Sequence, residues 1–177
     1  MAELSPCAEH HGVVDALPNG RATVGTLVNM PSINGVSTIP LKKVTNDRGH
    51  LMEVQREDDP HYPGFGQAYI TCTPPGVIKA WYRHHKQVDQ IALVKGELVI
   101  ALYDARKDSQ TCNNLMEIHN SEQEPVLVQI PPGVWHGFKS VGNEAAYLLH
   151  LNSVAFDFEQ TDEDRLPVDT PLIPYEW

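Results

Sequence analysis

Basic residues are scarce in this sequence. Its 177 residues include 13 Lys and Arg against 23 Asp and Glu, which gives a formal net charge of -10 at pH 7. Because non-specific binding to nucleic acid depends on a basic surface, we expect no nucleic-acid partner. A small anionic ligand stays compatible with this charge, since a local pocket can differ in sign from the whole chain.

Long apolar runs are missing as well. No stretch approaches the roughly 18 uncharged apolar residues of a membrane span, so we expect no membrane partner. Residues 1–6 contain no basic cluster followed by an apolar run, so we expect no secretory signal. Cys7, Cys72 and Cys112 form no C-x-x-C pair, which argues against a zinc ribbon. Their odd number and wide spacing are typical of reduced thiols, and on this basis we expect a cytoplasmic protein.

Short β-rich runs separated by turn residues fill most of the chain. The runs cover residues 38–44, 51–55, 66–73, 77–82, 90–94, 97–103, 126–130 and 145–151. Many short strands at this spacing predict an all-β sandwich or barrel. Residues 156–165 are acidic and poor in turn residues, and for them we expect a short C-terminal helical segment.

The length fits one domain with one hydrophobic core. Residues 1–20 carry Pro18, Asn19 and Gly20 and show little periodicity. We therefore predict an N-terminal arm over residues 1–20, which can be disordered, and one domain over residues 21–177.

Two segments carry candidate chemistry. In the first, which runs from Gly76 to Gly96, strand alternation places Tyr82 and His84 on one face. By strict alternation Lys79 faces away from them, so a role for Lys79 in the same pocket requires a bulge or twist. The second segment reads Pro-Pro-Gly-Val-Trp-His and leads, through its stiff prolines, into a strand that bears His136.

These spacings resemble the two motifs of the cupin family. The first motif has a glycine, five residues, His-x-His, a short gap, an acidic residue, six residues and a second glycine. Here Tyr82 stands in the first histidine position and Asp89 in the acidic position. The second motif, Pro-x-Gly-x-x-His, matches at Pro131, Gly133 and His136. The resemblance implies a double-stranded β-helix, the cupin or jelly-roll barrel, but it says little about the reaction, because such barrels host many chemistries.

A longer resemblance, over roughly residues 44–177, is to the dTDP-4-dehydrorhamnose 3,5-epimerase group of sugar-nucleotide epimerases and ketoisomerases. It rests on Arg48-Gly49 with Glu53, Gln67, Gly76-Val77-Ile78-Lys79, Gly96-Glu97, Asp104-Ala105-Arg106, residues 130–138 and Asp169-Thr170-Pro171. The resemblance implies a homodimer with exchanged N-terminal strands, a sugar-nucleotide ligand and no cofactor. It also implies that Arg48, Glu53, Gln67 and Lys79 bind the substrate.

The chemical centre departs from that group. The group's catalytic histidine corresponds to Tyr82, its lysine to Asp89 and its proton-donating tyrosine to Leu149. A leucine cannot return a proton, so the group's own double epimerisation is not expected from these positions.

Catalytic candidates remain nevertheless, namely His84, Tyr82, His136 and, by the resemblance, Asp169. A neutral imidazole such as that of His84 moves protons near neutral pH. The Tyr82 hydroxyl could donate to an enolate oxygen, and His136 could bind or polarise a ketone. We therefore predict an isomerase: an epimerase or ketoisomerase that acts on a nucleoside diphosphate-linked 4-keto-6-deoxy sugar by proton transfer beside the ketone.

Two alternatives belong to other classes. His84, Asp89 and His136 offer two imidazoles and a carboxylate, which is the ligand set of a metal-dependent cupin enzyme. We rank it second, because metal cupins usually have a further histidine where Tyr82 stands. The other alternative is a non-catalytic sugar-nucleotide-binding protein, which would bind without turnover. Every functional interpretation requires Tyr82, His84 and His136 to point into one cavity.

Overall fold

The computed structural model describes residues 32–177, which form twelve β-strands and no helix. The predicted arm over residues 1–20 lies outside the described residues. The strands are β1 (Ser37–Pro40), β2 (Lys43–Asn46), β3 (Gly49–Met52), β4 (Gln67–Thr73), β5 (Ile78–His84), β6 (Asp89–Lys95), β7 (Glu97–Asp104), β8 (Leu115–Ser121), β9 (Val126–Ile130), β10 (Val134–Ser140), β11 (Ala146–Asn152) and β12 (Glu163–Arg165).

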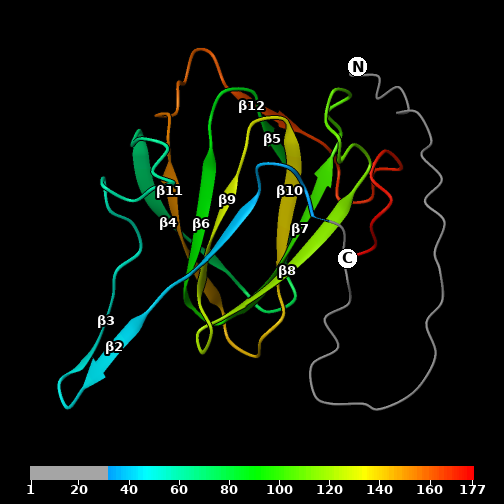
Figure 1. The fold of residues 1–177 in the computed structure, drawn as a ribbon. Helices are drawn as coiled ribbons and strands as arrows, with labels where there is room; N and C mark the ends of the chain where they lie inside the picture. The colour runs from blue at the N-terminus through cyan, green and yellow to red at the C-terminus, as the bar shows by residue number, and fades with distance from the viewer. Residues whose placement is uncertain (1–31) are drawn as a thin grey trace, which may run out of the picture.

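Two five-stranded sheets face each other and form the barrel (Figure 1). The first has the strand order β1-β9-β6-β11-β4, and the second has the order β12-β5-β10-β7-β8. Every paired strand is antiparallel to its neighbour. The hairpin β2–β3 makes a separate two-stranded sheet that projects from the barrel (Figure 1). The prediction of an all-β jelly-roll is confirmed.

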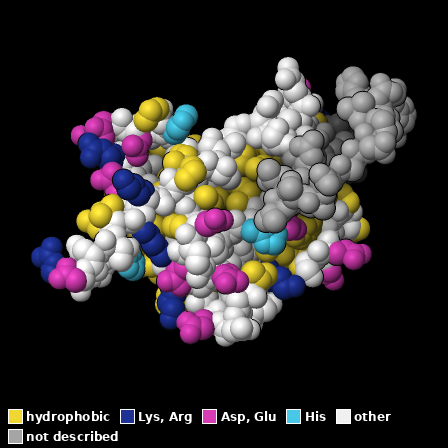
Figure 2. Space-filling view, turned by 60° about the horizontal axis from the view of Figure 1, so that its bottom comes forward, with side chains coloured by type: hydrophobic (Ala, Val, Ile, Leu, Met, Phe, Trp, Pro, Cys, Tyr) yellow, Lys and Arg dark blue, Asp and Glu magenta, His cyan; other side chains and the backbone are white. Residues whose placement is uncertain are grey.

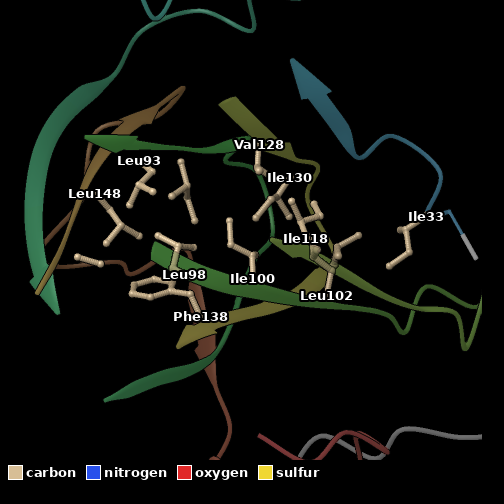
Figure 3. Close-up of a cluster of buried hydrophobic side chains, with 13 residues drawn as sticks. Ile33, Leu93, Leu98, Ile100, Leu102, Ile118, Val128, Ile130, Phe138 and Leu148 are labelled. Carbon is tan, nitrogen blue, oxygen red and sulfur yellow. The ribbon is translucent and has the colours of Figure 1, made fainter. Parts of the chain in front are cut away.

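The main core fills one part of the space between the two sheets. Its buried side chains point toward one another from both sides (Figure 3). They are Ile33, Ile91, Leu93, Leu98, Ile100, Leu102, Ile118, Val128, Ile130, Val134, Phe138, Ala146 and Leu148. Burial of a large aliphatic side chain stabilises a fold by about 1.5–3 kcal/mol relative to its exposed state, so this cluster holds the sheets together.

A second cluster covers the outer face of the β5-β10-β7 region. Trp81 of β5, Trp135 of β10 and Ala101 of β7 pack there against Ile173 and Trp177 of the C-terminal segment. Strand β7 is therefore buried on both faces, which explains why its sequence is nearly continuously apolar rather than alternating.

The helix expected over residues 156–165 is wrong. The segment forms bends and then the short strand β12, which pairs with β5. Side chains of the segment bond to backbone instead of leaving it free for a helix. Asp157 accepts from the N–H groups of Glu159 and Gln160, and Asp162 accepts from the backbone of the β5–β6 loop.

The cysteines behave differently from one another. Cys72 is a free thiol and is exposed, whereas Cys112 is disulfide-bonded. The expectation of reduced thiols is therefore wrong for Cys112, and the cysteines give no support to a cytoplasmic location. No helix long and apolar enough to cross a membrane occurs among residues 32–177.

Candidate active site

An inner cavity of about 190 Å³ lies between the two sheets, beside the main core. It brings together Tyr82, His84 and His136, as a functional site requires. Tyr82, His84 and His136 belong to one sheet, whereas Asp89 comes from the other. The full lining is Tyr69, Thr71, Lys79, Tyr82, His84, Asp89, His136, Phe138, His150, Glu163 and Arg165.

An outer cavity of about 410 Å³ adjoins the inner one. The two share Tyr69, His84 and Glu163, so a ligand can extend from one into the other. Gln67 and Phe156 line the outer cavity, and the Gln67 side-chain oxygen accepts from the backbone N–H of Phe156. The site thus has a buried inner end and a wider outer end.

His136 and Asp89 form a buried ion pair at the inner end. The His136 Nε2 atom lies 3.0 Å from Asp89 Oδ2, and its Nδ1 atom lies 3.2 Å from the Val134 carbonyl oxygen. Since both ring nitrogens face acceptors, the doubly protonated imidazolium is the form in which both can donate. Burial raises the pKa of Asp89, but the hydrogen bond and charge of His136 outweigh it and bring the pKa to about 2.

His84 stands next to this pair. Its ring centroid is 5.8 Å from that of His136. Burial lowers the pKa of His84 below its ordinary value of 6.5, although the negative charge of Asp89 opposes the shift. The His84 imidazole is therefore neutral near pH 7 and can accept a proton.

Tyr82 lies opposite His136 in the β5–β10 pairing, and the two ring centroids are 6.3 Å apart. The Arg165 guanidinium carbon lies 5.4 Å from the centroid of the Tyr82 ring. The second cation of the cavity, Lys79, donates from Nζ to the Cys72 carbonyl oxygen at 2.9 Å.

The predicted requirement for a bulge at Lys79 is met. In the β5–β10 register Tyr82 pairs with His136 but Lys79 pairs with Phe138, so three steps along β5 match two along β10. The extra residue turns Lys79 onto the same face as Tyr82. Lys79 consequently lines the inner cavity, where strict alternation would have excluded it.

Three predicted site residues lie elsewhere. Arg48 is an exposed residue of the turn between β2 and β3, and the exposed Glu53 side chain pairs with Arg56 at 3.7 Å. Asp169 lines a separate hollow near the C-terminus together with Ile78, because residues 166–177 pack on the outer face of the sheet. Among the described residues of this chain, these three contribute nothing to the inner cavity.

Strand β11 presents a histidine that the sequence patterns do not predict. Leu149 faces outward and lines a surface hollow with Leu151, whereas His150 faces the inner cavity. His150 is buried, and its Nε2 atom lies 3.1 Å from Thr71 Oγ1. Burial lowers the pKa of His150. The alternation of buried and less buried residues along β11 would have identified it, had the register been known.

The geometry also keeps the metal alternative open. Ligand atoms of His84, Asp89 and His136 all lie within 4.8 Å of one another. The buried Asp89 Oδ1 and His84 Nδ1 atoms have no hydrogen-bond partner, and imidazole with carboxylate suits first-row divalent metals. These residues fit a divalent cation.

The fold and this histidine-lined interior define a barrel enzyme of the cupin type. The family model for dTDP-4-dehydrorhamnose 3,5-epimerase matches residues 31–177, and the chain belongs to this family. The prediction of a sugar-nucleotide epimerase or isomerase is thereby confirmed.

Individual proteins with similar sequences or structures are consistent with this family. A probable low-salt glycan biosynthesis epimerase of Haloferax volcanii is 37% identical over 150 residues, which cover 84% of this chain and 96% of that protein. The spore coat polysaccharide biosynthesis protein SpsL of Bacillus subtilis is 35% identical over 145 residues, 82% of this chain and 96% of that protein. Among solved structures, the dTDP sugar isomerase of Desulfovibrio desulfuricans superposes with a TM-score of 0.78 at 29% identity, over 82% of this chain and 92% of that one.

Proposed function

We propose that the inner cavity holds the 4-keto-6-deoxy sugar of a nucleoside diphosphate-linked substrate and that its side chains move a proton beside the ketone. The observation that carries this proposal is the convergence of Tyr82, His84 and the His136–Asp89 pair on one small cavity. Its volume of about 190 Å³ is below the roughly 300–1,000 Å³ of pockets for drug-sized ligands. The cavity therefore suits the sugar alone, with the nucleotide in the adjoining outer cavity.

The residues of the inner cavity have different roles in the proton transfer. Neutral His84 takes the proton from the carbon next to the ketone, and the electrons of that C–H bond form the double bond of an enolate. The ketone oxygen gains the negative charge, and the Tyr82 hydroxyl stabilises it by donating a hydrogen bond. The two ring nitrogens of His136 already face Asp89 and the Val134 carbonyl, so His136 acts on the enolate only through its electrostatic field.

The similar dTDP sugar isomerase supports a dTDP-linked substrate. The cations of the inner cavity, Lys79 and Arg165, would face the anionic part of the ligand, although Arg165 also pairs with Glu163. The chain's surplus of acidic residues does not prevent this, because both cations line the cavity.

Deuterium exchange tests the proposal directly. The protein is incubated with a dTDP-linked 4-keto-6-deoxyhexose in D₂O, and deuterium at the two carbons beside the ketone is followed by NMR. We expect exchange with wild-type protein and a loss of about 100-fold or more with His84→Gln. His119→Gln, which changes an exposed histidine of β8, should leave exchange unchanged. Binding of the sugar nucleotide without any exchange would instead identify a non-catalytic binding protein.

The second candidate function is a metal-dependent reaction at the same place, which the clustered donor atoms of His84, Asp89 and His136 favour. A bound divalent cation would act there as a Lewis acid on a substrate oxygen. Elemental analysis of protein purified without chelator separates the two candidates. About one metal equivalent per chain, lost in Asp89→Asn, would support the metal, whereas full exchange by metal-free protein would exclude its need.

We also propose that the chain forms a homodimer with exchanged N-terminal strands. The projecting hairpin β2–β3 supports this, since its apolar residues Val44 and Leu51 are 51% and 64% exposed. A partner would also explain why Arg48, which the resemblance assigns to the substrate, lies far out on this hairpin. A cytoplasmic location stays a prediction.

A further inference from the structure

Groups for proton transfer stand on two opposed walls of the inner cavity. His84 and His136 belong to strands β5 and β10 of one sheet, and His150 belongs to β11 of the other. A sugar ring held between the sheets therefore presents one face to His84 and the other face to His150. An epimerase must remove a proton from one face of a carbon and return a proton to the other.

The His150 ring is held firmly in place. Its face stacks on Tyr69 with ring centroids 4.6 Å apart and planes 10° apart. Its Nε2 atom is 3.1 Å from Thr71 Oγ1, while its buried Nδ1 atom has no protein partner. One ring nitrogen is thus used for positioning, and the other is left without a structural role.

We propose that His150 is the second catalytic residue of this epimerase and exchanges a proton with the substrate carbon on the face opposite His84. The inference rests on the proposed function and extends it, because it assigns the group that makes the reaction invert a centre rather than only exchange its hydrogen. Leu149, at the position of the family's tyrosine, faces outward and cannot take this part.

The proton balance is simple. Neutral His84 removes the proton from one face, and the C–H electron pair becomes part of the enolate. Burial lowers the pKa of His150, so the ring first takes up a proton from water. The imidazolium so formed then gives an N–H proton to the same carbon from the other face, the enolate pair forms the new C–H bond, and the ketone returns. His84 loses its extra proton to water through the outer cavity, which it also lines. In the reverse reaction His150 removes the proton and His84 returns one.

Tyr69 is the competing donor on the same wall, because it too lines the inner cavity. Burial, assisted by the negative charge of Asp89, raises the pKa of Tyr69 to about 12. A phenol that holds its proton so strongly is a poorer match to proton transfer near neutral pH than an imidazole. Tyr69→Phe therefore serves as the comparison variant, since it keeps the ring that stacks on His150.

The test separates inversion from exchange. His150→Gln keeps an amide able to bond Thr71, and His150→Phe keeps the stacking on Tyr69, but neither can transfer a proton. Both are incubated with the dTDP-linked 4-keto-6-deoxyhexose in D₂O. Deuterium uptake into unreacted substrate and formation of the epimer are measured separately, after circular dichroism and thermal unfolding have established that the variants are folded.

We expect both variants to lose inversion by about 100-fold or more while His84-dependent exchange into the substrate stays within about fivefold of wild type. His119→Gln, at an exposed position of β8, should keep wild-type inversion, whereas a loss of inversion in Tyr69→Phe equal to that in the His150 variants would assign the donor to Tyr69 and overturn the proposal. Inversion at a wild-type rate in either His150 variant, or an equal fall of exchange and inversion in the folded variants, would overturn the assignment. Absence of exchange in wild-type protein would instead refute the proposed function.

Discussion

At the scale of single residues, the site replaces the family's charges by a different pair. By the resemblance, the position of the family's lysine corresponds to a carboxylate, Asp89, which would repel an enolate if it acted alone. Its contact with His136 at 3.0 Å changes the outcome, because the carboxylate is paired with an imidazole rather than left facing the substrate alone. A carboxylate–imidazole pair thus stands where the resemblance places a lysine, and the lysine that lines the cavity is Lys79 of β5.

Removal of the carboxylate charge tests this exchange of roles. In Asp89→Asn the His136 Nε2 atom loses its charged partner at 3.0 Å, so His136 is held less firmly and stabilises the enolate less. We expect kcat for the isomerisation to fall by about 100-fold or more, with a smaller change in KM. Steady-state kinetics with the dTDP-linked ketosugar measures it. Asp108→Asn, in an exposed loop, is the control, and an equal effect of both substitutions would contradict the role of Asp89.

At the scale of elements, the β5 bulge depends on a glycine in the neighbouring strand. A Cβ atom at Gly137 of β10 would lie 2.3 Å from the Ala80 Cβ atom and 2.9 Å from Trp177 Cζ2. The close approach of β5 and β10 at the bulge therefore requires a residue without a side chain. This approach is what directs Lys79 into the cavity.

Gly137→Ala is expected to force the two strands apart. Overpacking of this kind costs about 1–3 kcal/mol of unfolding free energy, and the displaced bulge should also weaken substrate binding through Lys79. Urea denaturation measures the first effect and KM the second. In Gly142→Ala the nearest atom would be 3.4 Å away, an ordinary contact, so stability should change by less than about 0.5 kcal/mol. Unchanged stability of Gly137→Ala would show that the bulge tolerates a side chain.

Turn residues made many strands predictable. Strand β9 (Val126–Ile130) coincides with the predicted run, because Pro131 and Pro132 end it. The predicted run over residues 38–44 is in fact divided between β1 and β2. Strand β8 (Leu115–Ser121) has few β-branched residues and owes its form to pairing with β7, and β12 likewise owes its form to pairing with β5. Such tertiary pairing cannot be inferred from local composition.

In the candidate site, too, some residues could be predicted from the sequence and others could not. Motif spacing correctly indicates that Tyr82, His84 and His136 share a cavity. His150 escapes such patterns because neither cupin motif extends over β11. Counting along the family's sequence selects Leu149, whereas the alternation along β11 buries Ala146, Leu148, His150 and Asn152 and so places His150 inside.

At the scale of the whole molecule, the buried histidines should make stability depend on pH. Burial lowers the pKa of His84 and of His150 in the folded chain, and unfolding restores the ordinary 6.5. The charges of Asp89, His136 and Lys79 act on His150 as well. Between the folded and ordinary pKa values the unfolded chain binds more protons, so stability falls as the pH drops below about 6.5.

At lower pH the buried carboxylates cause a second loss of stability. The folded pKa values of Asp89 and Asp104 are about 2 against an ordinary 3.8, so the stability they contribute is complete above 3.8 and lost as the pH falls toward 2. Urea midpoints measured from about pH 8 to about pH 3 should show both losses. His150→Phe should reduce the fall in stability below about pH 6.5 and leave the fall below about pH 3.8 unchanged. A constant urea midpoint between about pH 7.5 and about pH 5 would contradict the role of the histidines.

The surface as a whole leaves apolar side chains uncovered. They lie among charged side chains on the face that Figure 2 shows, and exposed apolar residues include Phe65 at 63% and Ile70 at 62% beside the two on the hairpin. A projecting two-stranded hairpin is marginally stable on its own in water, so its apolar residues indicate a covering surface. A second copy of the chain offers such a surface in the exposed residues of β4 and β11.

The double substitution Val44→Asp with Leu51→Asp tests this assembly. Two carboxylates in an apolar contact would remain desolvated and unpaired, which destabilises the dimer by several kcal/mol and should make the protein monomeric at micromolar concentration. Light scattering after size exclusion measures the mass. Asn46→Asp adds charge on the same hairpin without removing apolar area, so this control should stay dimeric. Wild-type protein of monomer mass, or an unchanged dimer in the double variant, would exclude a dimer built through the hairpin. If the hairpin also carries Arg48 to the partner's cavity, the monomer should show a raised KM for the sugar nucleotide while each barrel remains folded.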